Sequence, residues 1–97
     1  MSKYMNIVRF RVKPEFKDLI VSKFAEFKRP SGYQMGRLVQ TGEFTYCSVG
    51  EWDSQESLVN ARPAMIGFLD SVRHMLEEIN PELGVTDPLS GPVVQEQ

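Results

Sequence analysis

Apolar and polar positions alternate over residues 4–12, where Val8, Phe10 and Val12 share one face. This period of two predicts a β-strand. After Pro14 the period changes, and apolar residues recur every three or four positions as far as residue 28. That spacing is typical of an amphipathic helix that begins at a proline.

The alternation returns over residues 33–40 and again over residues 44–52. Only the three residues TGE separate the two runs, so they are predicted to form a hairpin of neighbouring strands. Asp53 follows the second run, with Glu56 three positions later, which is the spacing of a helix N-cap and its N3 partner. A second helix is therefore predicted to begin at Asp53.

The second helix is predicted to be long and bent, because Pro63 interrupts a helical apolar spacing that continues to Asn80. Residues 81–97 are rich in glycine and proline and predict an irregular tail with a short final strand at an edge of the sheet. That strand is placed at residues 83–86 or 92–94. The order β-α-β-β-α-β predicts an α+β, ferredoxin-like fold with an antiparallel sheet.

Two helices can cover only one face of such a sheet, so the other face should need a partner. Ile7, Leu38 and part of the apolar residues of 44–52 are assigned to that second face. Pairing of two sheets in a symmetric homodimer would bury it.

The composition is that of one ordinary globular domain, residues 1–97, with 41% apolar and 25% charged residues. A net charge of −2 without long basic runs argues against nucleic acid as a partner. The single Cys47 excludes an internal disulfide, and no segment has the pattern of a membrane span or signal peptide. We therefore expect a cytoplasmic protein without a membrane partner.

Three short motifs carry a resemblance to a known family: VRFRVKPE at residues 8–15, Gly32 before the second strand, and VGEWDSQES at residues 49–57. With the element order, they make the chain similar to the antibiotic-biosynthesis-monooxygenase-like superfamily of dimeric α+β barrels. The resemblance implies a homodimer with a small pocket between sheet and helices in each subunit. Members include cofactor-free oxygenases of aromatic polyketide-like molecules and heme-degrading enzymes.

The heme-degrading branch is disfavoured at the level of single residues. Val8, Ala61 and Ser71 stand where the resemblance would place the asparagine, tryptophan and histidine of that branch. No cluster of His, Cys or carboxylates has the spacing of metal ligands. We therefore expect neither a cofactor nor a metal.

Three pocket candidates lie on the predicted strands. Trp52 could stack on a flat aromatic ligand or could simply clamp the second helix onto the sheet, which is the interpretation that we favour. Tyr46 shares its strand face and could donate a proton, although a core role is again favoured. Asn6, near the start of the first strand, could hold a ligand oxygen or satisfy nearby backbone groups.

Three further candidates lie on the predicted second helix: Asn60 and Arg62 flank Pro63, and Met65 follows it. An exposed surface position explains the first two equally simply. His74, the only histidine, falls among acidic residues on the solvated side of the helix, so we do not expect it to be a general base. Cys47 is predicted to be a small buried residue rather than a nucleophile.

Two functions are compatible with this sequence. The first is a cofactor-independent monooxygenase or related oxidoreductase that acts on a small aromatic or polyketide-like molecule. The second is a non-catalytic homodimeric domain that binds a small apolar metabolite, which the absence of a convincing acid–base pair would favour.

Overall fold

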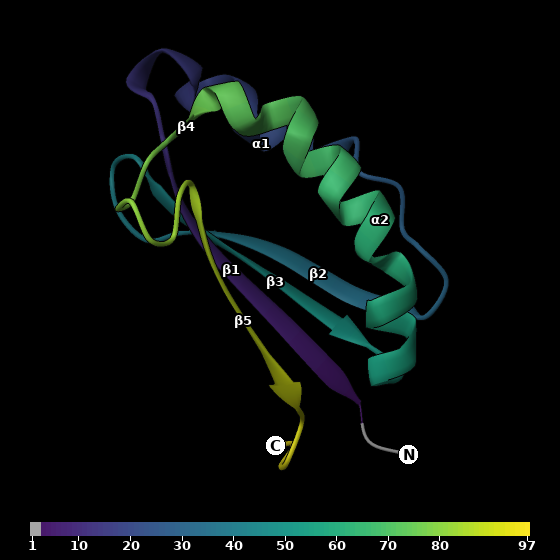
Figure 1. Cartoon of the computed structure of the whole chain (residues 1–97). Coiled ribbons are helices and arrows are strands. Elements are labelled where there is room, and N and C mark those ends of the chain that lie inside the picture. Colours follow the sequence, from purple (N-terminus) through teal and green to yellow (C-terminus); the bar gives the residue numbers. More distant parts are fainter. Residues whose placement is uncertain (1–2) are drawn as a thin grey trace.

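A curved sheet and two helices form the two layers of the computed structural model, which describes residues 3–97 (Figure 1). The strands are β1 (Tyr4–Val12), β2 (Tyr33–Gln40), β3 (Thr45–Trp52), β4 (Leu76–Glu77) and β5 (Thr86–Pro92), and the α-helices are α1 (Lys17–Ala25) and α2 (Gln55–Val72). Single 3₁₀ turns at Pro14–Phe16 and Arg73–Met75 precede α1 and follow α2.

The five strands are all antiparallel, in the order β2-β3-β1, and β4 and β5 both pair with the other side of β1. Both helices lie over the same face of the sheet (Figure 1). This arrangement confirms the predicted α+β, ferredoxin-like class.

The N-terminus of α2 differs by one residue from the prediction. Ser54, not Asp53, is the N-cap, and its hydroxyl accepts a hydrogen bond from the backbone N–H of Ser57 at 3.2 Å. The helix then runs through Pro63 as one continuous element. Proline leaves the carbonyl of Val59 without its helical partner, and the exposed position of Val59 lets water replace it.

The predicted helix was too long at its C-terminal end. It stops at Val72, and Leu76, which keeps the helical spacing in sequence, pairs instead with Val12 at one end of β1. Leu76 is buried in that position, so sheet pairing and core packing together outweigh local periodicity.

The predicted helix over 14–28 is also shorter, because its first turn is 3₁₀ and its last helical residue is Ala25. The final strand occupies Thr86–Pro92, between the two predicted positions, and pairs with β1 over seven residues. It is an edge strand as predicted, which lets it contain Pro88.

A bulge at the start of β2 decides which side chains face the helices. Tyr33 pairs with Trp52 and Met35 with Glu51, so Gln34 is an extra residue between them. The bulge reverses the alternation, and Leu38, which pairs with Ser48, lies on the helix-covered face and packs against the core. The assignment of Leu38 to the open face was therefore wrong.

The core consists of two adjoining clusters between the sheet and the helices. The larger contains Phe10, Val12, Ile20, Tyr46, Val72, Met75 and Leu76, and the smaller contains Trp52, Leu58 and Ala61. Ile7 faces away from the helices, as predicted, and Cys47 shares that open face. Cys47 is half-buried rather than buried, because no helix covers it.

Candidate functional site

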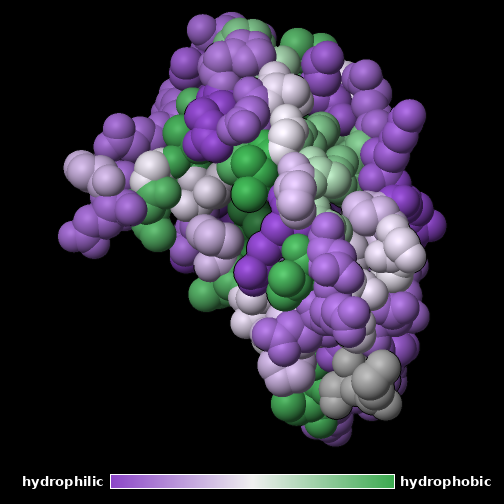
Figure 2. All heavy atoms as spheres, turned by 45° about the vertical axis from the view of Figure 1, so that its right-hand side comes forward, coloured by the Kyte–Doolittle hydropathy of each residue, from purple (hydrophilic) through white to green (hydrophobic). Residues whose placement is uncertain are grey.

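A cavity of about 810 Å³ lies between the sheet and the helices. It is bordered by all four long strands, by both helices and by the segment that joins α1 to β2. Figure 2 shows apolar side chains gathered at the centre of one face of the molecule, with polar residues around them. A volume of this size is within the usual range for sites that take a small organic molecule.

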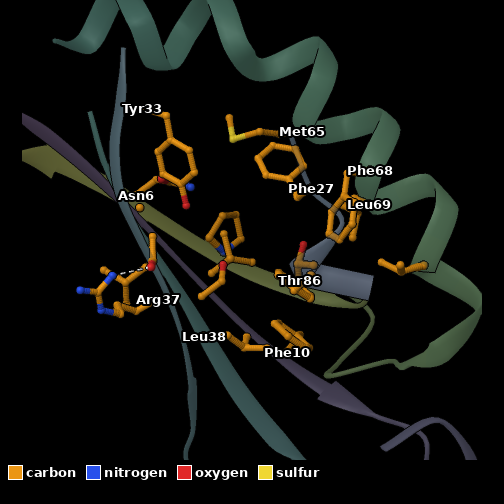
Figure 3. Close-up of a pocket in the computed structure, with 18 of the residues that line it drawn as sticks. Asn6, Phe10, Phe27, Tyr33, Arg37, Leu38, Met65, Phe68, Leu69 and Thr86 are labelled. Carbon is orange, nitrogen blue, oxygen red and sulfur yellow. Dashed lines mark hydrogen bonds between the residues drawn. The ribbon is translucent and has the colours of Figure 1, made fainter. Parts of the chain in front are cut away.

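Aromatic and aliphatic side chains form most of the cavity wall. The rings of Phe10 and Phe24 stack with centroids 5.3 Å apart, and Phe24 meets Phe68 edge to face at 5.0 Å. Phe27, from the segment after α1, packs against Phe68 and closes the helix side (Figure 3). Leu69 on α2 continues the same wall, and Thr86, opposite Phe10, is a polar side chain at this mainly apolar end.

The opposite end of the cavity carries its polar side chains. Asn6 on β1 accepts a hydrogen bond from the indole N–H of Trp52, with Nε1 and Oδ1 2.7 Å apart. This bond uses the amide oxygen of Asn6, and among the described residues no side chain pairs with its NH₂ group. Asn6 can therefore donate hydrogen bonds to a ligand.

Gly50 makes room for this polar group. It lies between Asn6 and Gly36 in neighbouring strands, and its bare Cα faces three converging side chains. A Cβ at Gly50 would lie 2.6 Å from Asn6 Oδ1, 3.1 Å from Tyr33 Cε1 and 3.3 Å from Trp52 Nε1. The site therefore requires glycine at this position.

Tyr33 is held in place by the sheet beneath it and by Trp52 beside it. Its ring stacks on the indole of Trp52 with centroids 4.8 Å apart, and its hydroxyl lies over Gly36, where a Cβ would clash with Oη. Figure 3 shows the phenol beside Asn6 at one end of the cavity. Ring stacking and the missing side chain of Gly36 together fix the hydroxyl.

Burial raises the pKa of Tyr33 above its ordinary value, while the nearby charges of Arg29 and Arg37 lower it. The net direction is upward, so the phenol is protonated at neutral pH and acts as a hydrogen-bond donor. The guanidinium of Arg29 lies 5.4 Å from the ring centroid of Tyr33.

The structure brings together four of the six sequence-predicted candidates. Asn6, Trp52, Arg62 and Met65 all border the cavity. Trp52 is only 1% exposed, and its indole is stacked against the ring of Tyr33.

The other two candidates lie elsewhere. Tyr46 is buried in the larger core cluster, stacked against Phe10, and does not border the cavity. Asn60 is exposed on α2 and does not border it either. The position of Asn60 follows from the helix face, because the face that includes Leu58 and Met65 turns inward and Asn60 does not share it.

Sequence reasoning missed Tyr33, the central polar residue of the site. Because Leu38 was assigned to the open face, strict alternation along β2 would place Tyr33, Met35 and Arg37 together on the helix-covered face. The bulge at Gln34 turns Met35 and Arg37 to the open face and keeps Tyr33 on the helix side. The available signal was the glycine that precedes Tyr33, since Gly32 has a φ of +85° and marks an irregular entry into the strand.

The other chemically reactive side chains are remote from this cavity. His74 is exposed and makes an edge contact with Phe16, and Cys47 lies on the open face of the sheet. Ser71, at the position that the heme-degrading branch would fill with histidine, is exposed and donates to the carbonyl of Phe68. Within residues 3–97, no group of His, Cys, Asp or Glu is arranged to hold a metal ion.

Over the same range, every helix is too short or too polar to cross a membrane.

Comparison with known proteins gives similarity in structure only. No protein-family model and no curated protein sequence matches this chain. Among solved structures, a Chloroflexus aurantiacus protein provisionally assigned as an antibiotic biosynthesis monooxygenase is 17% identical, with a TM-score of 0.76 and coverage of 99% of this chain and 97% of that one.

Two further structures are similar over almost their whole length. A variant of SnoaB, a cofactor-independent oxygenase from Streptomyces nogalater, is 16% identical, with a TM-score of 0.72 and coverage of 99% and 97%. A dimeric ferredoxin-like protein from an uncultured marine organism is 14% identical, with a TM-score of 0.71 and coverage of 100% and 92%. The chain therefore has the fold of the antibiotic biosynthesis monooxygenases and of their ferredoxin-like relatives.

Proposed function

We propose that this protein is a cofactor-independent oxygenase that acts on a small, planar aromatic or polyketide-like molecule bound in the cavity. The observation that carries this proposal is the polarity of the cavity. Phenylalanine rings line one end, and the amide of Asn6 and the phenol of Tyr33 lie at the other. Flat rings fit the first end, and a carbonyl or enol oxygen fits the second.

The two polar groups would stabilise negative charge on that oxygen. The NH₂ group of Asn6 and the protonated hydroxyl of Tyr33 are both donors. Donors that are already positioned for an oxyanion lower the energy of its formation, typically by about 2.7–4 kcal/mol for each donor in known enzymes. Trp52 would act indirectly, because its N–H orients the amide of Asn6.

The proposed reaction oxidises a CH₂ group next to the ring carbonyl. Loss of one proton to water gives an enolate, which the two donors hold. The enolate transfers an electron to molecular oxygen, and the resulting pair combines into a C–O–O bond. Loss of water then leaves a second carbonyl, so that one CH₂ group and one O₂ give one C=O group and one H₂O.

The test is oxygen consumption with a panel of tricyclic aromatic ketones that carry such a CH₂ group. We expect turnover for at least one member, with a fall of at least tenfold in kcat for Tyr33→Phe and for Asn6→Leu. Tyr4→Phe is the matched control, because Tyr4 packs against Trp52 without bordering the cavity. No consumption with any ketone, although the compounds bind, would contradict the proposal.

That last outcome would favour the second function, a homodimeric domain that binds an aromatic metabolite without turnover. One observation supports it: the residues that border the cavity include no histidine and no carboxylate that could accept the substrate proton. Binding without oxygen consumption would then be measured by calorimetry with the same ketones.

We further propose that the protein forms a homodimer through the open face of the sheet. Met5, Ile7, Val39, Cys47, Val49 and Leu89 are on that face, and Leu89 is 60% exposed. A stable interface of this kind buries about 2,000 Å² or more in total. Light scattering at micromolar concentration should give twice the mass of 11.1 kDa, and a monomer would refute this part of the proposal.

A further inference from the structure

Positive charge is concentrated around the cavity, although the chain as a whole is slightly acidic. The chain has 13 acidic and 11 basic residues. Of the charged side chains that border the cavity, however, all three are arginines: Arg29, Arg37 and Arg62. The charged side chains that border the cavity are therefore all positive, in contrast to the net charge of the protein.

Two of these arginines, Arg29 and Arg62, belong to segments beside the polar end of the cavity. Arg29 covers the ring of Tyr33 and donates to the carbonyl of Gln34 at 2.9 Å. Arg62 belongs to the turn of α2 whose neighbours Ala61 and Met65 pack against the Trp52 cluster. Arg37 turns its guanidinium away from the cavity and donates to the carbonyl of Gly36 (Figure 3).

None of the three arginines forms a salt bridge with any residue from 3 to 97. Neither acidic residue of the neighbouring strand and turn, Glu51 or Asp53, borders the cavity. Glu51 lies on the open face beside Lys3, and Asp53 accepts a hydrogen bond from Ser57. The charges of Arg29 and Arg62 are therefore free to attract a negatively charged ligand.

We infer that the cavity takes its aromatic ligand as an anion, with the rings against the phenylalanines and the negative oxygen at the end formed by Asn6, Tyr33, Arg29 and Arg62. The inference rests on the proposed function and narrows its substrate class to aromatic ketones whose enol form is acidic. The residues that border the cavity include no base that could remove a proton from the substrate. An acidic substrate does not need such a base, because it ionises in water before it binds.

The test compares two fluorescent probes that share one ring system. The anionic probe is 8-anilino-1-naphthalenesulfonate, and its neutral counterpart, N-phenyl-1-naphthylamine, lacks only the sulfonate. We expect the anion to bind at least tenfold more tightly in low salt. Arg29→Gln and Arg62→Gln should each weaken binding of the anion about fivefold and leave the neutral probe within about twofold.

Three further variants make the result specific. Arg73→Gln is the matched control, because Arg73 is an exposed arginine away from the cavity, and it should change neither affinity. Arg29→Lys keeps the charge and should keep most of the preference for the anion, which separates charge from a structural effect on the segment after α1. Met65→Trp fills the cavity and should weaken both probes.

Equal affinity for the two probes, or equal losses for both in the glutamine variants, would overturn the inference while leaving the cavity as a ligand site. If Met65→Trp changed neither affinity, or if neither probe bound, the cavity would not be the ligand site. That result would overturn the proposed function together with the inference.

Discussion

Trp52 offers the sharpest test of how this fold is held together. Its side chain is 1% exposed, stacks on Tyr33, and donates its N–H to Asn6 at 2.7 Å. Replacing it with alanine removes the ring and leaves a cavity at the junction of β3 and α2. Such a change costs about 3–5 kcal/mol, a large share of the ~5–15 kcal/mol that stabilises a typical domain.

Trp52→Phe separates the ring from its hydrogen bond. Phenylalanine keeps a ring for Tyr33 to stack on but leaves the amide oxygen of Asn6 without its donor. A hydrogen bond lost at a half-buried site costs about 1 kcal/mol. The free energy of unfolding of Trp52→Ala should therefore be lower than that of Trp52→Phe by roughly 2–4 kcal/mol.

Urea denaturation followed by circular dichroism measures both values, at one protein concentration because association would change the midpoint. In thermal melts the alanine variant should fall by more than about 12 °C, since ~1 kcal/mol shifts the melting temperature by 4–8 °C in a domain of this size. An alanine variant within about 1 kcal/mol of the wild type would refute the role of Trp52 as a clamp.

Three further predictions concern single positions. Gly67→Ala should stabilise α2 by about 0.5–1 kcal/mol, because a Cβ there meets nothing within 4 Å and alanine favours a helix; chemical denaturation measures the gain. Gly36→Ala should instead displace the hydroxyl of Tyr33, and we expect at least a fivefold loss of probe affinity; unchanged affinity would show that the phenol does not contact the ligand. Ultraviolet titration should find one tyrosine, absent in Tyr33→Phe, with a pKa above the ordinary 10.0, because burial disfavours the phenolate. The unfolded chain loses that proton first, so the stabilisation is complete below about pH 10 and is lost as the pH rises through the folded pKa of Tyr33.

The sequence was sufficient to predict the architecture. Most segments with strand alternation or helical spacing form the predicted strands and helices in the structure. β1 spans the predicted residues 4–12, and β2 spans the predicted residues 33–40. Local patterns failed where a distant residue decides the outcome. Leu76 continues the helical spacing of α2, but only its pairing with Val12 makes it a strand residue.

The site was predictable where its residues follow regular alternation and was missed where they do not. Asn6 and Trp52 were found because β1 and β3 pair without a bulge in the stretch that carries them. Tyr33 was missed because alternation alone does not distinguish it from Met35 and Arg37, which a single extra residue, Gln34, turns to the open face. Register shifts depend on the pairing of two strands, so one strand read alone does not reveal them.

The central position of β1 has a kinetic consequence. Its neighbours are β3, about forty residues further along the chain, and β5, which pairs Tyr4 with Pro92. Nearly every contact of this strand must therefore close a long loop before it gains any stabilisation. Chains dominated by such distant pairings reach the native state in milliseconds to seconds rather than microseconds. During that time the unpaired β1 is exposed to other chains, so we expect refolding yields to fall as protein concentration rises.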